Sequence, residues 1–99
     1  MTIKWNKIAI KSLLDAISFI EENGYQSYAE ELEHRILGLI KNLPERYRQY
    51  PLDRFRVAND GSYRAAIVDD YRISFRVKAD EIQIVRIRHT SRKPRFYRR

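Results

Sequence analysis

The side chains of this sequence that could do chemistry are mostly cations, and they gather toward its end. The closing stretch "RHTSRKPRFYRR", residues 88–99, carries six Lys or Arg, one His and two aromatic residues, and no acid. Cations in such density attract phosphates and carboxylates. This region also contains His89, and because histidine is the residue type used most often as a proton donor and acceptor in catalysis, His89 is a candidate acid or base.

Other chemistries lack the residues they need. The sequence has no Gly-rich phosphate loop, no Ser, His and Asp in triad order and no carboxylate pair at catalytic spacing. It has no Cys and only two His, so we expect no disulfide, no metal and no cofactor. Any enzyme built from this sequence would work with cations.

The charge is divided unequally along the chain. Residues 1–50 contain seven Lys or Arg and seven Asp or Glu, whereas residues 51–99 contain thirteen against six. The net charge of +7 therefore belongs to the second half. Such a distribution indicates a polyanionic partner, either nucleic acid or an acidic protein segment. A basic surface that serves only solubility is the alternative.

The composition is typical of a folded protein, and 99 residues suit one domain spanning 1–99. No apolar run approaches the roughly 18 residues needed to cross a bilayer. Residues 1–12 lack the apolar region of a secretory signal. We therefore expect a cytoplasmic protein without membrane contact.

Two helices are predicted in the first half, after a short β-capable start. Apolar residues recur at helical spacing over about residues 7–22, between the possible N-cap Asn6 and the stop signal Asn23-Gly24. A second amphipathic pattern starts after Ser27 and ends at Pro44. The two helices should form a hairpin.

Three β-rich runs follow: "YRAAIVD", "YRISFRVK" and "EIQIVRIRH". In the middle run apolar residues alternate with polar and basic ones, so one face is apolar and the other basic. The third run changes phase between Ile84 and Val85, so either a bulge shifts the register or both faces are covered there. A long connection before these runs should contain a short strand or a turn near Phe55–Val57.

These elements predict an α+β fold of order β-α-α-β-β-β. The helical hairpin should pack on the apolar face of a small, mainly antiparallel sheet, because no other surface is large enough to receive it. The opposite face would carry Arg64, Arg72, Arg76, Arg86 and Arg88.

The order of elements and several short motifs resemble the RelE/ParE superfamily of toxins from bacterial type II toxin-antitoxin pairs. The motifs are a helix that ends in "NG", a second helix that ends in Leu-Pro, "DYRISFRV", and "IQIVRIRHTSRKP" with its R-x-R-H-x-x-R pattern. The resemblance covers nearly the whole chain.

This resemblance implies a small cytoplasmic toxin that a cognate antitoxin holds inactive. An acidic or partly disordered antitoxin would suit the basic surface, because such a chain can fold as it binds. RelE-like members cut messenger RNA on the ribosome without a metal, whereas ParE-like members inhibit DNA gyrase and are not nucleases. Of these two activities the sequence favours the RelE-like endoribonuclease, because part of its residue set is present. A third interpretation is a basic RNA- or ribosome-binding module without a toxin role.

The resemblance also carries catalytic roles to four positions. Arg72 matches the phosphate clamp of the central strand, and a solvated arginine is the alternative. Arg64 matches the first basic position of the preceding strand, but Ala66 stands at the second. Arg92 matches a basic residue near the terminus, and Tyr97 matches a late tyrosine that moves a proton or stacks on a base.

Five further basic residues are candidates for RNA binding: Arg76, Arg86, Arg88, Lys93 and Arg95. The remaining alternatives stay open. His89 follows Ile87 on the side assigned to the core, so it could be a structural histidine, and Phe96-Tyr97 could anchor the terminus rather than react.

Overall fold

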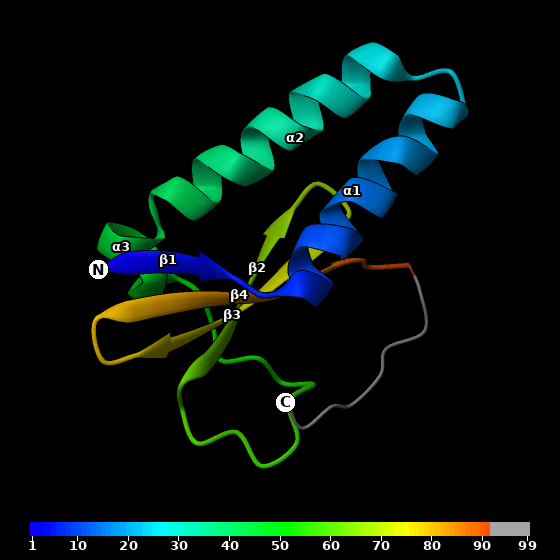
Figure 1. Cartoon of the computed structure of the whole chain (residues 1–99). Coiled ribbons are helices and arrows are strands. Elements are labelled where there is room, and N and C mark those ends of the chain that lie inside the picture. Colours follow the sequence, from blue (N-terminus) through cyan, green and yellow to red (C-terminus); the bar gives the residue numbers. More distant parts are fainter. Residues whose placement is uncertain (92–99) are drawn as a thin grey trace.

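A computed structural model describes residues 1–91 of the chain. Figure 1 shows a helical hairpin that lies on one face of a four-stranded sheet. The elements in chain order are β1 (Thr2–Trp5), α1 (Lys7–Glu22), α2 (Gln26–Lys41), α3 (Leu43–Arg46), the 3₁₀ helix η1 (Tyr47–Gln49), β2 (Tyr63–Val68), β3 (Tyr71–Lys78) and β4 (Glu81–His89). The predicted α+β arrangement is confirmed, with the short helices α3 and η1 added between the hairpin and β2.

Helix α1 begins after the predicted N-cap Asn6 and ends before the predicted stop signal Asn23-Gly24. The Asn6 side chain accepts a hydrogen bond from the Ala9 N–H at 2.7 Å and so caps the first turn. After the helix, Gly24 has a φ of +86°, the left-handed conformation that a residue without a Cβ adopts without strain. The buried stripe of α1 consists of Ala9, Leu13, Ile17 and Ile20.

Helix α2 buries a matching stripe, made of Ala29, Leu32, Ile36 and Ile40. It starts at Gln26 and ends at Lys41, so Pro44 does not end it directly. Pro44 lies instead in the first turn of α3, where a residue without an N–H removes no helical hydrogen bond.

The sheet has the strand order β1-β4-β3-β2. Strand β1 runs parallel to β4, and the other neighbours are antiparallel. Two-residue turns, Asp69-Asp70 and Ala79-Asp80, join the three consecutive strands, and the first residue of each turn has a φ of +53°. Because these turns are so short, they fix which residues of neighbouring strands lie opposite each other.

The phase change in the last strand is a β-bulge. Ser74 lies opposite Arg86 and Phe75 lies opposite Ile84, so Val85 is the extra residue. Of the two alternatives that the sequence leaves open, the bulge is therefore the observed one. It keeps both Ile84 and Ile87 in the core, on either side of the shift.

The core lies between the hairpin and one face of the sheet. The largest sheet residues in it are Ile73, Phe75, Ile82, Ile84 and Ile87. Each such side chain contributes about 1.5–3 kcal/mol by leaving water. Strand β1 pairs with β4 from Glu81 to Ile84. Further along the same edge of β4, helix α1 supplies the partner: the Ser12 Oγ accepts a hydrogen bond from the Ile87 N–H at 3.0 Å.

The connection between η1 and β2 forms turns around Phe55–Val57, one of the two forms that the sequence predicts. Its start, Pro51–Asp53, runs along the outer edge of β2. The Ala65 N–H donates to the Pro51 carbonyl at 3.1 Å, and the Asp53 N–H donates to the Tyr63 carbonyl at 2.9 Å. No helix among residues 1–91 has the length and apolar character needed to cross a membrane.

Candidate binding face of the sheet

The face of the sheet that points away from the hairpin carries most of the arginines predicted for it. The strand register places on it Tyr63, Ala65 and Ile67 of β2, Arg72, Ser74 and Arg76 of β3, and Arg86 and Arg88 of β4. We call these residues the basic face. Arg72 lies directly opposite Arg88, and like charges in such a pair repel each other. The basic face is thus suited to an anionic partner.

Arg64 does not belong to the basic face, and its predicted position there is wrong. The turn Asp69-Asp70 pairs Val68 with Tyr71, so the same register places Arg64 opposite the core residue Phe75. On that side, the Arg64 Nη1 donates to the Tyr50 carbonyl at 2.6 Å. Arg64 therefore holds η1 against the sheet and lies across the sheet from Arg72.

Arg72 is on the basic face but is engaged by the connection before β2. Its Nη1 lies 3.9 Å from the Asp53 Oδ1, and its guanidinium carbon lies 4.3 Å from the centre of the Phe55 ring. The Asp53 side chain is fully buried and also accepts a hydrogen bond from the Phe55 N–H at 3.0 Å. These contacts hold Arg72 in one geometry and leave it partly exposed.

Arg76 is similarly held by the turn before β2. Its Nε donates to the Ser62 Oγ at 3.0 Å, and its Nη2 lies 3.6 Å from the Asp60 carboxylate. The Ser62 hydroxyl and N–H also donate to Asp60, which lowers the pKa of the Asp60 carboxyl below its ordinary value; Arg76 lowers that pKa further. The "NDGS" segment therefore forms the turn that its sequence predicts, and the turn binds Arg76.

A stack of arginines and a tyrosine completes this end of the basic face. The Arg56 guanidinium carbon lies 3.9 Å from the centre of the Tyr63 ring, and that of Arg76 lies 4.8 Å from it. The Arg56 Nη2 donates to the Tyr63 hydroxyl at 3.0 Å. Arg56 was not among the predicted site residues, because the aperiodic connection gives no signal of the face on which it packs.

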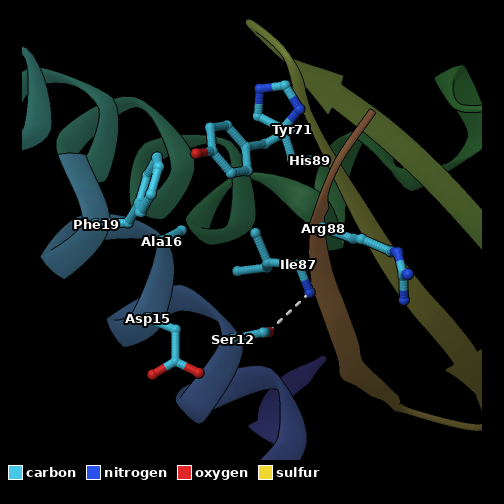
Figure 2. A pocket seen from close by; sticks show the side chains of 8 residues that line it. All are labelled: Ser12, Asp15, Ala16, Phe19, Tyr71, Ile87, Arg88 and His89. Atoms are coloured by element: carbon cyan, nitrogen blue, oxygen red, sulfur yellow. Dashed lines mark hydrogen bonds between the residues drawn. The ribbon is translucent and has the colours of Figure 1, made fainter. Parts of the chain in front are cut away.

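His89 lies on the helix side of the sheet, in agreement with the predicted alternation. Its ring packs edge to face on Tyr71 with 5.0 Å between ring centres, and its Nδ1 lies 2.6 Å from the Ser91 Oγ. His89 lines a hollow of about 100 Å³ beside α1 and β4. Figure 2 shows that the Arg88 side chain points away from the other residues that line it. His89 and the arginines of the basic face therefore do not share one surface.

The other predicted site residues, Arg92, Lys93, Arg95 and Tyr97, lie outside the described residues, as does Phe96. Among residues 1–91 no three His, Asp or Glu come together in a group that could hold a metal ion. The described part of the basic face carries four cations: Arg72, Arg76, Arg86 and Arg88.

Comparison with known proteins agrees with this architecture. The model of a family described as "ParE toxin of type II toxin-antitoxin system, parDE" matches residues 3–94. No curated protein matches the chain. Among solved structures, "Chromosomal ParDE TA system from P. aeruginosa" has a chain 24% identical in sequence, with a TM-score of 0.72; the match covers 92% of this chain and 97% of that one. At this identity the structural match supports the fold.

Proposed function

The chain belongs to the ParE toxin family of type II toxin-antitoxin systems, and from this premise we propose that it arrests growth by inhibiting DNA gyrase rather than by cutting messenger RNA. A toxin of this kind has a cognate antitoxin as its partner. The arrangement of the predicted catalytic arginines favours gyrase over messenger RNA as the target.

The observation that carries the proposal is the separation of Arg64 from Arg72. A nuclease must bring its cations to one phosphate, because each has to contact the charge that develops there. Here Arg64 faces the core side and binds the Tyr50 carbonyl, whereas Arg72 lies on the opposite face. Ala66 supplies no cation at the second basic position of the family pattern. This arrangement favours a protein that binds its target without cleaving a phosphodiester.

Ribosome-dependent cleavage of messenger RNA is the competing function. It would depend on Arg92 and Tyr97, together with Arg72. Arg72 could still contact a phosphate, because it remains partly exposed beside Arg88. A binding module for RNA or ribosomes would use the same basic face, but membership of a toxin family argues against it.

Two assays on the purified protein separate these functions. We expect it to block supercoiling of relaxed plasmid by DNA gyrase and to leave messenger RNA intact in a cell-free translation reaction. Codon-positioned cuts together with normal supercoiling would reverse the order of the two functions. Normal supercoiling and intact RNA together would contradict both.

A pair of charge reversals ties the effect to the basic face. Arg86→Glu lies on that face, and we expect it to weaken gyrase inhibition by about tenfold or more, because it reverses a charge at the proposed contact. Lys11→Glu is the matched control, since Lys11 is an exposed cation on α1 that pairs with Asp15 and lies away from the basic face. Equal inhibition by both variants would remove the basic face from the proposal.

A further inference from the structure

The four cations of the basic face are all arginines, and three of them lie close together. Arg86 and Arg88 are two residues apart on β4, which corresponds to about 7 Å along a strand. Arg72 lies directly opposite Arg88, at a position where Cβ atoms are about 5 Å apart. A guanidinium donates two parallel hydrogen bonds to a phosphate or a carboxylate, which a lysine ammonium does not. This cluster is therefore suited to closely spaced anions.

The exposed surface of the basic face contains little apolar area. Tyr63, Ala65 and Ser74 are buried, and Ile67, at the outer edge of the sheet, is 53% exposed. Protein interfaces are centred on apolar and aromatic anchors. In the described part of the chain most of the large exposed apolar side chains lie instead on α1 and α2: Ile8, Ile10, Leu14, Phe19, Tyr28 and Leu37. The basic face therefore suits a nucleic acid better than an acidic protein surface.

The described part of the basic face also has no exposed ring on which a base could stack. Its aromatic residue, Tyr63, is 7% exposed. The guanidinium carbons of Arg56 and Arg76 lie 3.9 Å and 4.8 Å from the centre of that ring, so the ring is already in contact with the protein's own arginines. Proteins hold single-stranded nucleic acids largely by stacking bases on aromatic rings. A duplex, whose bases stack on each other, fits this surface better.

The width of the sheet decides which part of a duplex it can contact. The four strands are separated by three gaps of about 4.8 Å, which gives about 14 Å before side chains are added. The major groove of DNA is about 12 Å wide and admits a helix or a two-stranded ribbon. The sheet face can therefore contact the phosphate backbone but not the base edges, and such contacts carry no sequence information.

The hairpin, on the other face of the sheet, carries negative charge. Residues 12–34 form the second part of α1, the turn and the first half of α2, and they contain six Asp or Glu and no Lys or Arg. Figure 1 shows that the turn of the hairpin lies away from the strands. A polyanion is attracted to the basic face and repelled by this part of the hairpin. The charges thus favour one orientation, with the sheet toward the polyanion.

We propose that the basic face binds the phosphate backbone of duplex DNA through Arg72, Arg86 and Arg88, without reading the sequence of the DNA. The inference deepens the proposed function and rests on it, because gyrase acts on duplex DNA and the toxin would meet the enzyme with that DNA bound. In this arrangement Arg86 contacts a phosphate of the DNA rather than the gyrase protein.

The proposal is tested by fluorescence anisotropy with the full chain and a labelled duplex of about 20 base pairs, in the absence of gyrase. The logarithm of the association constant should fall with the logarithm of the salt concentration, with a slope of at least about 2.7 in magnitude, because each of three phosphate contacts contributes about 0.9. Two duplexes of unrelated sequence should bind equally, and a single strand of the same length should bind more weakly. No binding in 50 mM salt, a preference for one duplex, or tighter binding of the single strand would overturn the proposal.

Substitutions that remove one charge locate the contact. Arg86→Gln and Arg88→Gln should each reduce the magnitude of the salt slope by about 0.9. Lys11→Gln removes the same charge from α1 and should leave the slope unchanged. Circular dichroism shows whether each variant folds, and if one arginine variant does not fold, the other decides. An unchanged slope in a folded arginine variant, or an equal reduction in Lys11→Gln, would contradict binding through the basic face.

A polyglutamate of matched charge separates phosphate binding from general attraction to anions. It should bind more weakly, because an extended peptide carries one charge per about 3.5 Å whereas duplex DNA carries one per about 1.7 Å of its axis. Equal affinity for the two polyanions would overturn the proposal. DNA binding together with normal supercoiling would contradict the proposed function and support this inference. Blocked supercoiling by a protein that does not bind DNA would do the reverse.

Discussion

At the scale of single residues, Asp53 joins the connection between η1 and β2 to the sheet. Its carboxylate is buried between the Phe55 N–H and the Arg72 guanidinium. We expect Asp53→Ala to lower the free energy of unfolding by about 3 kcal/mol, because it leaves Arg72 without its buried counter-charge. Urea unfolding measures this. Asp53→Asn should cost less, since its amide oxygen can still accept from Phe55.

The Asp53 contact also changes how a loss of function at Arg72 must be interpreted. Arg72→Ala removes a cation from beside a buried carboxylate, so we expect lower stability as well as any lost activity. The double variant Arg72→Ala with Asp53→Asn should be more stable than Arg72→Ala alone, because the leftover charge is gone. Unfolding curves for the four members of this cycle measure the coupling. Additive effects would mean that the pair contributes nothing.

Asp60 gives stability a dependence on acid pH. Hydrogen bonds from Ser62 lower the pKa of the Asp60 carboxyl in the folded protein, with a smaller effect from Arg76. Because the ionised carboxylate is favoured in the folded protein, it stabilises the fold above about pH 4, the ordinary pKa of an Asp carboxyl. This stabilisation is lost as the pH falls through the pKa that Asp60 has in the folded protein. We expect Asp60→Asn to be less stable than the parent at pH 6 and equally stable near pH 2. Urea unfolding at both pH values checks this, and a constant difference would contradict it.

At the scale of elements, Ser12 joins the hairpin to the last strand. Its hydroxyl accepts from the Ile87 N–H at 3.0 Å and donates to the Ala9 carbonyl at 2.9 Å. We expect Ser12→Ala to cost about 1–3 kcal/mol, because a buried backbone N–H then has no acceptor. Hydrogen exchange at Ile87 should accelerate. Ser18→Ala, on the exposed side of the same helix, is the control and should change neither quantity.

The elements differ in how far the sequence predicts them, and the reason is the range of the interactions involved. The span of α1 follows from local signals, the Asn6 cap and Gly24, and is predicted to the residue. The predicted face of Arg64 is wrong, because the alternation of residues within one strand does not show how that strand pairs with its neighbour. A two-residue turn at Asp69-Asp70 places Val68 opposite Tyr71. Counting back along β2 from this pair places Arg64 opposite Phe75, so this turn could have corrected the prediction.

The contacts that the connection between η1 and β2 makes with the basic face could not be predicted from the sequence. Asp53 and Phe55 belong to no periodic pattern, and their contacts with Arg72 join residues far apart in the chain. The basic character of β3 and β4 is evident from the sequence, because Arg72 and Arg76 alternate with core residues. The sequence does not show which of these arginines form ion pairs within the protein, as Arg72 does with Asp53 and Arg76 does with Asp60.

At the scale of the whole molecule, the positive charge lies in the second half of the chain. Residues 51–99 hold thirteen Lys and Arg against six Asp and Glu. Residues 51–89 of this half build the connection and the three consecutive strands, whereas five of the thirteen cations belong to residues 92–99, outside the described part of the chain. We expect partner binding to weaken several-fold as salt rises from 50 to 200 mM, because screening shortens the reach of exposed charges. Titration calorimetry at several salt concentrations measures this. Arg86→Glu should flatten the dependence, because it reverses one charge of the basic face, and an unchanged slope would place the partner elsewhere.

The pairing of β1 with β4 bears on how the protein is made. Thr2 pairs with Glu81 and Trp5 with Ile84, so within residues 1–91 the first strand to be synthesised pairs with the last. At the usual rate of translation, about 5–20 residues per second, the β1 segment waits several seconds for that neighbour. Closing so long a loop late gives slow folding. The newly made chain therefore spends its first seconds as an incomplete sheet, and an antitoxin already present in the cell can meet the toxin before it is fully formed.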